Sequence, residues 1–351
     1  MNIFEFEKEK IFERLDYAPE PAGYTGRVPW KVQQQIAATN GIHFQDSVGK
    51  LSEYPIPDIP IKAAVDDSSL LLDIGSGWGR WLVAGAKKNY IPIGLDFRLE
   101  FCETARQVLK DNGFNGYTVV GDLKELPFRE GVFSAVWSFS VIQHTHKDRL
   151  LSCINHIYRV LCKGGFSCLE FPNRDGWRNK RGPVKREEPY KDDYNSWCVR
   201  YYSIDEYKKM FERIFSNFSF KNHSFLGIGI LPNDLKYAKG FKSRLGIAIS
   251  LGLSSLTKVL TPMKHIADSI YIECFKQAGE SSAAVVEFMQ YHKADPSNNL
   301  NIICLLQCPI SGGPLKLSEA KDRLISEKGG VYFPVVNQIP ILVPSQAVSL
   351  V

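Results

Sequence analysis

The stretch Leu70-Leu-Leu-Asp73-Ile-Gly75-Ser76-Gly77-Trp-Gly79 decides the fold. A short apolar run ends in Asp73, and glycines then follow at alternate positions. A buried strand that passes into a glycine-rich turn lets a ligand approach the backbone closely, because glycine has no Cβ. The first N–H groups of the following helix then face that ligand. The stretch predicts a nucleotide-like binding site. The alternative is a glycine turn without a ligand.

Two kinds of binding loop could explain this stretch. The dinucleotide fingerprint is G-x-G-x-x-G, with an acid about 20 residues later. Counted from Gly75, its third glycine would fall at position 80, which is Arg80. The stretch instead resembles the acid-x-G-x-G-x-G loop of the class I methyltransferases that depend on S-adenosylmethionine (SAM), in which the acid precedes the glycines. The resemblance implies SAM as cofactor, S-adenosylhomocysteine as product, and cofactor contacts at Asp73, Gly75, Ser76 and Gly77.

Two further segments support this resemblance, because each reads as a buried strand that ends in an acid. Residues 90–96 end in Asp96, and residues 117–122 end in Asp122. Between them, residues 98–110 have helical apolar spacing and stop near Gly113. The resemblance implies that Asp96 accepts both ribose hydroxyls, which suits a carboxylate. It implies that the adenine amino group is held at Asp122. The resemblance also implies that Phe97 and Leu123, which follow these two acids, belong to the cofactor site.

The alternation of strands and helices continues beyond Asp122. Residues 133–137 form a fourth strand that runs into Ser138, residues 150–161 form an amphipathic helix that ends at 163–165, and residues 166–171 form a fifth strand. This alternation predicts a doubly wound parallel sheet with helices on both faces. Ligands bind at the carboxyl ends of such strands, where Asp73, Asp96, Asp122 and Ser138 all fall. Ser138 is therefore the last candidate cofactor residue.

The predicted fold class is α/β: a Rossmann-like, doubly wound, mostly parallel seven-stranded sheet with a small C-terminal α+β domain. The length of 351 residues suits about two domains. The composition divides the chain into an N-terminal cover or lid (1–60), a methyltransferase domain (61–277), a linker (278–298) and a small domain (299–351).

Charge and cysteine content exclude several classes of function. The formal net charge of +5 gives no case for DNA binding. Eight cysteines without a C-x-x-C pair suit reduced core residues of an intracellular protein. Residues 1–14 are too charged for a signal peptide, and no apolar run reaches the ~20 residues of a membrane span. We expect a cytoplasmic protein. The sequence does not determine its oligomeric state.

Two segments are candidates for closing the site. Residues 16–60 are irregular and rich in aromatics, and they either bring rings near the sulfonium or only cover the sheet. Residues 172–200 are an acceptor insertion after the fifth strand, where acceptor loops occur. Their mixture of basic and aromatic side chains suits a sugar, a phosphate or an anionic lipid head group, and a solvated loop is the alternative. The side chains concerned are Arg174, Trp177, Arg178, Lys180, Arg181, Lys185, Arg186, Tyr190, Tyr194 and Trp197.

The part of the chain after the insertion predicts a helix that begins after Ser203, because Asp205 and Glu206 follow it. This region resembles methyltransferases that act on bacterial surface polysaccharides and similar small acceptors. Residues 244–260 carry no charge between their basic ends. They form either an interfacial helix at a lipid-linked acceptor, with peripheral contact to the inner face of the membrane, or a cover helix before a final strand at 269–275. Asp268 precedes that strand and is a weak candidate for shaping the acceptor pocket.

The C-terminal segment contains Cys308-Pro-Ile-Ser311 and a Phe333-to-Val343 strand pair. It resembles a short zinc-ribbon-like family whose best-known member is the small activator subunit of tRNA and protein methyltransferases. Metal-binding members hold zinc with paired cysteines. Here Cys304 and Cys308 cannot build a tetrahedral site, so we expect no metal. About fifty residues without metal or disulfide are marginal alone. The segment is therefore expected to dock in cis on the sheet edge near the third strand.

The chemistry follows from the cofactor. A hydroxyl acceptor must lose a proton, and His144, which follows the fourth strand, is the candidate base. Three interpretations remain: methyl transfer to a hydroxyl of a sugar, glycan or other small molecule; methyl transfer to tRNA or protein, as relatives of the C-terminal segment suggest; or a SAM-binding scaffold without catalysis. Enzymes for planar nitrogen acceptors commonly carry an Asn-Pro-Pro-Tyr-like motif where this chain has Ser138-Phe-Ser-Val, and the intact loop at 73–79 counts against a scaffold.

Overall fold

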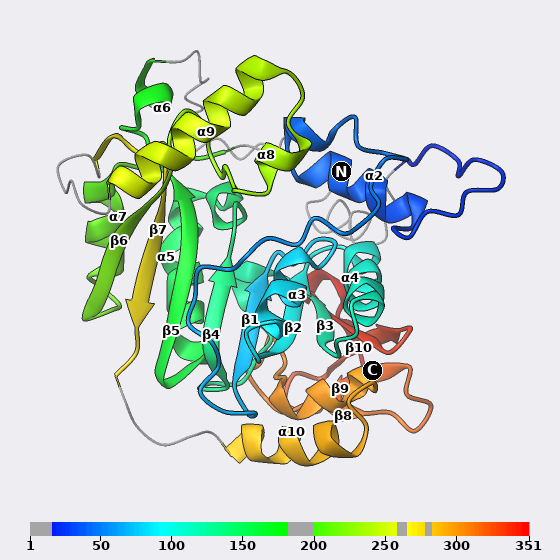
Figure 1. Ribbon diagram of the computed structural model, residues 1–351. Coiled ribbons are helices and arrows are strands. Elements are labelled where there is room, and N and C mark those ends of the chain that lie inside the picture. Colours follow the sequence, from blue (N-terminus) through cyan, green and yellow to red (C-terminus); the bar gives the residue numbers. More distant parts are fainter. Residues whose placement is uncertain (1–15, 182–198, 258–264, 278–282, 351) are drawn as a thin grey trace.

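The computed structural model describes residues 16–181, 199–257, 265–277 and 283–350 (Figure 1). A twelve-stranded sheet runs through the molecule in the order β6-β7-β5-β4-β1-β2-β3-β11-β10-β9-β8, with β12 paired to β10. The first seven strands of this order are β1 (Leu70–Ile74), β2 (Ile91–Asp96), β3 (Tyr117–Gly121), β4 (Phe133–Ser138), β5 (Leu161–Pro172), β6 (Asn217–Ser224) and β7 (Ser269–Phe275). The remaining strands are β8 (Lys316–Leu317), β9 (Arg323–Ser326), β10 (Val331–Val336), β11 (Ile339–Leu342) and β12 (Val348–Ser349).

The seven-stranded part has the predicted Rossmann-like architecture. Strands β1 to β5 pair in parallel, and β7 runs antiparallel between β5 and β6. The helices are α2 (Trp30–Thr39), α3 (Arg80–Ala86), α4 (Leu99–Asp111), α5 (Lys147–Val160), α6 (Trp177–Arg181), α7 (Ile204–Phe211), α8 (Asp234–Tyr237), α9 (Phe241–Leu256) and α10 (Ala283–Ala294). Short 3-10 turns include η2 (Leu123–Glu125), η3 (Ile142–His144) and η5 (Asn299–Leu305).

Helices cover both faces of the sheet, as the alternation of elements predicted. On one face α3 and α4 pack with the N-terminal segment, in a cluster that contains Ile36, Leu82 and Val108. On the other face α5 and α7 enter the main core through residues such as Ile154 and Phe211. The strands between them are buried on both sides, so β1 is an unbroken apolar run apart from Asp73.

The N-terminal segment covers one face of the sheet. Helix α2 buries Val32 and Ile36 against Trp78 and Leu82. Two aromatic residues of the segment are engaged within it. The Trp30 Nε1–H donates to the Ala18 carbonyl at 2.9 Å, and the Tyr24 hydroxyl donates to the Val28 carbonyl at 2.8 Å. These contacts fit a cover better than rings held free above a ligand.

Strand β5 begins earlier than predicted. Helix α5 ends at Val160, and Leu161 already pairs with Phe133 on β4. The register then shifts before Phe166 pairs with Ala135. Residues 163–165 therefore lie inside an irregular strand and do not end the helix. Their glycines read as a helix stop, but they form a bulge.

The stretch predicted as a linker contains α10. Phe288 and Ala284 of this helix are buried in the main core. The Phe288 ring lies 5.1 Å from the ring of Tyr117 on β3, and the Tyr117 hydroxyl lies 2.6 Å from His292 Nδ1. The glycine and serine residues that flank this stretch led to the prediction of a linker. The stretch instead forms a helix whose apolar side packs at the start of β3. Figure 1 shows α10 beneath the sheet, at its amino-terminal edge.

The C-terminal segment docks on β3, which confirms the predicted docking place. Strand β11 pairs in parallel with β3, with Ile341 opposite Val120 and Leu342 opposite Gly121. The tight turn from β10 to β11 holds Asn337 and Gln338 at φ values of 51° and 66°. Positive φ at both central residues is the geometry of a type I′ hairpin turn, whose twist matches the paired strands.

Asn299 extends this junction towards the start of β3. Its side-chain amide accepts from the Thr118 N–H at 2.8 Å and donates to the Thr118 carbonyl at 2.9 Å. It also donates to the Gln338 carbonyl at 2.9 Å. One buried side chain therefore satisfies both edge groups of Thr118 that a neighbouring strand would satisfy.

We expect Asn299→Ala to lower the free energy of unfolding by about 2–4 kcal/mol, because it removes the hydrogen bonds to both buried backbone groups of Thr118 and to the Gln338 carbonyl. Denaturant unfolding monitored by circular dichroism measures this. Asn217→Ala, at an exposed position on β6, is the matched control and should change stability by less than about 0.5 kcal/mol. Equal effects of the two substitutions would show that Asn299 does not hold the junction.

Candidate functional site

The glycine loop after β1 is tied to the end of β2. The N–H groups of Gly75 and Ser76 both donate to the Leu95 carbonyl, at 2.7 and 3.1 Å. The Gly77 N–H donates to Asp96 Oδ2 at 2.9 Å. Parallel pairing of β1 with β2 brings these groups together at the carboxyl ends of both strands. Residues 73–77 and Asp96 therefore form one site.

Two glycines of the loop are required for different reasons. Gly75 has a φ of 75°, and a Cβ there would lie 2.3 Å from Val141 Cγ2. Gly77 has a φ of 49°, but a Cβ there would meet nothing within 4 Å. Gly75 lets the loop after β4 approach closely, whereas Gly77 borders open space in which a ligand can lie against the backbone.

Asp73 is fully buried, and neither of its carboxylate oxygens has a hydrogen-bond partner among the described residues. Burial raises the pKa of Asp73 to about 8; the charge of Arg80 opposes this increase and that of Asp96 adds to it. The buried Ser76 hydroxyl also lacks a partner in the described part of the chain. Buried polar groups without partners are costly and rare, so these atoms point to a polar ligand.

Asp96 is held in place by backbone N–H groups. Oδ1 accepts from the Arg98 N–H at 3.0 Å, in addition to the bond from Gly77 to Oδ2. Burial raises the pKa of Asp96, although the N–H groups of Arg98, Gly77 and Phe97 favour its charged form. Each oxygen keeps a second lone pair for a ligand hydroxyl.

The other predicted cofactor residues have different surroundings. Asp122 begins η2 and accepts from the Lys124 N–H at 2.9 Å. Leu123 is partly buried against the core, and Phe97 packs beside the β11 cluster. The buried Ser138 hydroxyl donates to the Ile74 carbonyl at 3.2 Å, so it ties β4 to β1.

The structure adds Glu170, which sequence reasoning did not single out. Glu170 lies near the carboxyl end of β5, is fully buried, and its Oε2 accepts from the Ser140 N–H at 3.1 Å and the Ser140 hydroxyl at 2.8 Å. Burial raises the pKa of Glu170 to about 7, although the Ser140 hydroxyl lowers it. Ser140 has a φ of 57°, a strained backbone for a residue with a side chain. The sequence does contain one signal for this residue, because Glu170 is an acid inside the apolar run 166–171.

Arg80, where the dinucleotide fingerprint would need its third glycine, is a cation beside the site. Its guanidinium lies 5.2 Å from the ring centroids of both Trp81 and Phe139. Burial lowers the pKa of Arg80, and the charges of Asp234 and Asp73 oppose this decrease. The site therefore combines one arginine with several buried carboxyl groups.

His144 ends η3, in the turn that follows β4. Its N–H donates to the Val141 carbonyl at 3.0 Å, and its own carbonyl accepts from Arg200 Nη1 at 2.6 Å. These bonds fix the backbone of His144 at the same end of the sheet as Glu170. Asp268 accepts from the N–H groups of Arg178 and Asn179, at 2.7 and 3.1 Å, so it positions the start of α6.

Part of the predicted acceptor insertion is described. Arg174 pairs with Glu206 at 2.9 Å, and Glu206 also forms a capping box with Ser203, which confirms the predicted helix start. Trp177 is 47% exposed. The remaining predicted side chains Lys185, Arg186, Tyr190, Tyr194 and Trp197 lie outside the described residues, and nothing is described of the Arg181 side chain.

The cysteine turn of the C-terminal segment is lined by hydroxyl groups. Cys308 Sγ accepts from the Ser311 N–H at 3.4 Å, and the Ser311 and Ser326 hydroxyls lie 3.2 Å apart. Burial opposes ionisation of the Cys308 thiol, but hydrogen bonds from the hydroxyls of Ser311 and Ser326 and from the backbone of Ser311 and Ile310 together lower its pKa. Within the described ranges, no group of three or more His, Cys, Asp or Glu residues could hold a metal ion.

Comparison with known proteins identifies two parts of the chain. Residues 71–165 match the family model described as a methyltransferase domain. Over 52 residues the chain is 44% identical to a UPF0434 protein of Ectopseudomonas mendocina, a match that covers 15% of this chain and 85% of that protein. The chain therefore has a class I SAM-dependent methyltransferase core, and its C-terminal segment belongs to the UPF0434 family.

Two further similarities cover more of the chain. The chain is 32% identical over 104 residues to the tRNA (carboxymethyluridine(34)-5-O)-methyltransferase alkbh8 of Xenopus tropicalis, which is 29% of this chain and 15% of that protein. A solved complex between the Haloferax volcanii Trm112 methyltransferase activator and a methyltransferase contains a similar chain. That likeness has a TM-score of 0.41 at 17% identity, over 64% of this chain and 87% of the other.

We predict that Asp73→Asn stabilises the ligand-free protein above about pH 5. Folding raises the pKa of Asp73 from 3.8 to about 8. The contribution of Asp73 to the free energy of unfolding is therefore most favourable below pH 3.8, and it is lost as the pH rises towards 8. Asparagine removes this cost. We expect a gain of the order of 1–3 kcal/mol at pH 8 and little change at pH 4.

Thermal unfolding of the ligand-free protein at pH 4 and pH 8 measures this effect. Asp67→Asn, an exposed carboxylate just before β1, is the control and should behave alike at both pH values. A loss of stability in Asp73→Asn that grows with pH would contradict the prediction.

Proposed function

We propose that this methyltransferase transfers the methyl group of SAM to a hydroxyl of a sugar, a glycan or another small molecule. The observation that carries the proposal is Glu170. A carboxyl group with a pKa of about 7, fixed by Ser140 at the acceptor end of the sheet, can accept the proton that a hydroxyl must lose.

The residues around the glycine loop fit SAM. When bound, SAM supplies an electrophilic methyl group beside a positively charged sulfur. We assign Asp73 and Ser76, whose polar atoms have no partner in the described chain, to the polar amino acid end of SAM. Asp96 keeps lone pairs for the ribose hydroxyls, and Gly77 leaves room for the cofactor against the backbone. Asp122, Leu123 and Phe97 are assigned to the adenine side.

The acceptor side needs a base and a positioned hydroxyl. As the new C–O bond forms and the C–S bond breaks, the hydroxyl proton passes to a side chain. His144 and Glu170 are the two candidates: His144 lies in the turn after β4, and Glu170 lies near the carboxyl end of β5. Most of the remaining rate enhancement comes from holding the hydroxyl in line with the methyl group. The exposed Trp177 offers an apolar ring for a sugar face.

A tRNA acceptor is the second candidate. It is supported by the 104-residue similarity to a tRNA methyltransferase, although that match spans only 15% of the relative. Against it, residues 138–141 read Ser-Phe-Ser-Val and lack the Asn-Pro-Pro-Tyr-like motif common in enzymes for planar nitrogen acceptors. Methylation of an oxygen on tRNA would not need that motif, so experiment must separate the two acceptors.

Transfer of isotope-labelled methyl from SAM into fractionated cell extract tests the acceptor. The proposal expects label in the glycan, lipid-linked or small-molecule fractions, and no more label in RNA or protein than in a reaction without the protein. Label that enters RNA and is released by ribonuclease would overturn the small-molecule proposal and support the tRNA alternative.

We expect Asp96→Ala to weaken SAM binding by roughly 10- to 100-fold, because it removes a charged acceptor of ligand hydroxyls and releases Gly77. Titration calorimetry measures the dissociation constant. Asp67→Ala is the control and should bind SAM as the unaltered protein does. Unchanged affinity in Asp96→Ala would exclude Asp96 from the cofactor site.

The pH dependence of turnover separates the two candidate bases. A base accepts a proton only when it is deprotonated, so kcat should fall below about pH 7 if Glu170 is the base. Glu170→Gln would then lower kcat at least about 100-fold and abolish that acidic limb, whereas His144→Ala would keep it. If His144→Ala abolished the acidic limb and Glu170→Gln kept it, His144 would be the base. If neither variant changed the pH dependence of kcat, both residues would be excluded as the base.

We also expect the purified protein to contain no stoichiometric zinc. Cys308 is surrounded by hydroxyl groups, and hydroxyls are much weaker zinc ligands than thiolates. Elemental analysis of the full chain, before and after treatment with a chelator, measures this. One zinc per chain, lost together with thermal stability on chelation, would contradict the expectation.

A further inference from the structure

Helix α9 presents its apolar side to solvent. Phe241, Leu245, Ile249 and Leu256 are 79%, 45%, 44% and 48% exposed among the described residues. Their spacing of four, four and seven residues places them on one side of the helix. We call these four residues the α9 outer face. A surface helix of a globular protein normally buries its apolar side, so this arrangement is reversed.

The opposite side of α9 is polar and packs on the protein. The Ser250 hydroxyl accepts from the Phe225 N–H at 3.1 Å, and the Ser254 hydroxyl donates to the His223 carbonyl at 2.8 Å. Ile247 is the one large apolar side chain that the helix itself buries fully. These hydrogen bonds fix which side of α9 faces outward, so the exposure of the outer face is set by the fold.

The charged residues of the chain segment that contains α9 have a single sign. No Asp or Glu occurs from position 235 to position 267, whereas Lys236, Lys239, Lys242, Arg244, Lys258 and Lys264 do. Lys236 and Lys239 pair with Glu53 and Asp46. In the part of the chain that the structure describes, Lys242 and Arg244 have no ion-pair partner, and both lie at the beginning of α9 beside Phe241.

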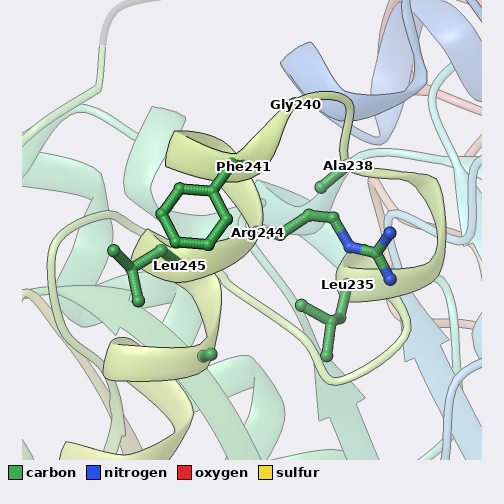
Figure 2. Close-up of a pocket in the computed structure, with 7 residues that line it drawn as sticks. Leu235, Ala238, Gly240, Phe241, Arg244 and Leu245 are labelled. Atoms are coloured by element: carbon green, nitrogen blue, oxygen red, sulfur yellow. The ribbon is translucent and has the colours of Figure 1, made fainter.

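A shallow hollow at the beginning of α9 combines these two properties. It is lined by Leu235, Ala238, Gly240, Phe241, Arg244, Leu245 and Ala248. Figure 2 shows Phe241 and Leu245 next to each other on α9, and Arg244 extending towards Leu235 and Ala238. The hollow therefore places a cation directly beside apolar side chains. A phosphate attached to a hydrocarbon chain has the complementary structure.

We propose that the α9 outer face binds the surface of a membrane that contains anionic phospholipid. Apolar side chains enter the boundary between head groups and acyl chains, and Lys242 and Arg244 meet the lipid phosphates. Within the described chain no helix is long and apolar enough to cross a bilayer. Helix α9 also lies at the end of the sheet where the parallel strands end, which turns the acceptor side towards the membrane (Figure 1). Membrane binding does not depend on which acceptor is methylated.

Co-sedimentation of the full chain with vesicles tests the proposal. Vesicles of phosphatidylcholine with an equal part of phosphatidylglycerol should bind the protein, and pure phosphatidylcholine should bind it at least about tenfold less. Phe241→Ser/Leu245→Ser/Ile249→Ser should weaken binding to the mixed vesicles at least about tenfold. The control Val65→Ser/Val286→Ser/Ile310→Ser removes apolar side chains that are at least as exposed from other parts of the chain, and it should bind as the unaltered protein does.

A second pair of variants tests the charges. Lys242→Glu/Arg244→Glu should weaken binding to mixed vesicles at least about tenfold, whereas Lys110→Glu/Lys163→Glu, on α4 and β5, should change it less than about twofold. Each variant must still show the rise in melting temperature that SAM causes, which demonstrates that it is folded. No binding by the unaltered protein, or equal binding by the α9 and control variants, would overturn the proposal. A dimer in solution that the triple α9 variant dissociates, without vesicle binding, would assign the face to a second copy of this chain.

Discussion

The hydrogen bonds that tie the glycine loop to the end of β2 are the constraint on which the rest of the site depends. Leu95 accepts from two loop N–H groups, and Asp96 accepts from a third at Gly77. These bonds need β1 and β2 to be parallel neighbours, because only then do both loops leave the sheet at the same edge. The strand order, the buried apolar runs and the cofactor site are therefore one arrangement.

Pairing between the C-terminal segment and β3 stabilises both of them. Strand β3 would otherwise be an exposed edge, and the segment alone is too small for a substantial core. Pairing of β11 with β3, together with the bonds from Asn299 to Thr118, removes both difficulties.

Two carboxyl groups near the loop are buried without full hydrogen bonding among the described residues. Asp73 and Glu170 are fully buried, and burial raises the pKa of both. Such groups are costly in a ligand-free protein, since the chain offers Asp73 no hydrogen bond among its described residues. A polar ligand that supplies the missing partner recovers this cost on binding. Ser140, whose backbone is strained at a positive φ, donates a hydrogen bond to Glu170 and holds its carboxyl group in place.

The sequence by itself determined the methyltransferase core, the order of its elements and the place where the C-terminal segment docks. It could do so because a buried parallel strand leaves an unbroken apolar run, and an acid or glycine at its end is a local signal. The α10 helix, the bulge at the start of β5 and the role of Asn299 were decided by tertiary structure, because their partners lie far away in the sequence. Only the fold could show that Glu170 is buried beside Ser140, or that α9 turns its apolar side outward. Burial and orientation depend on what packs against a residue, and the pattern of its neighbours in the chain does not contain that information.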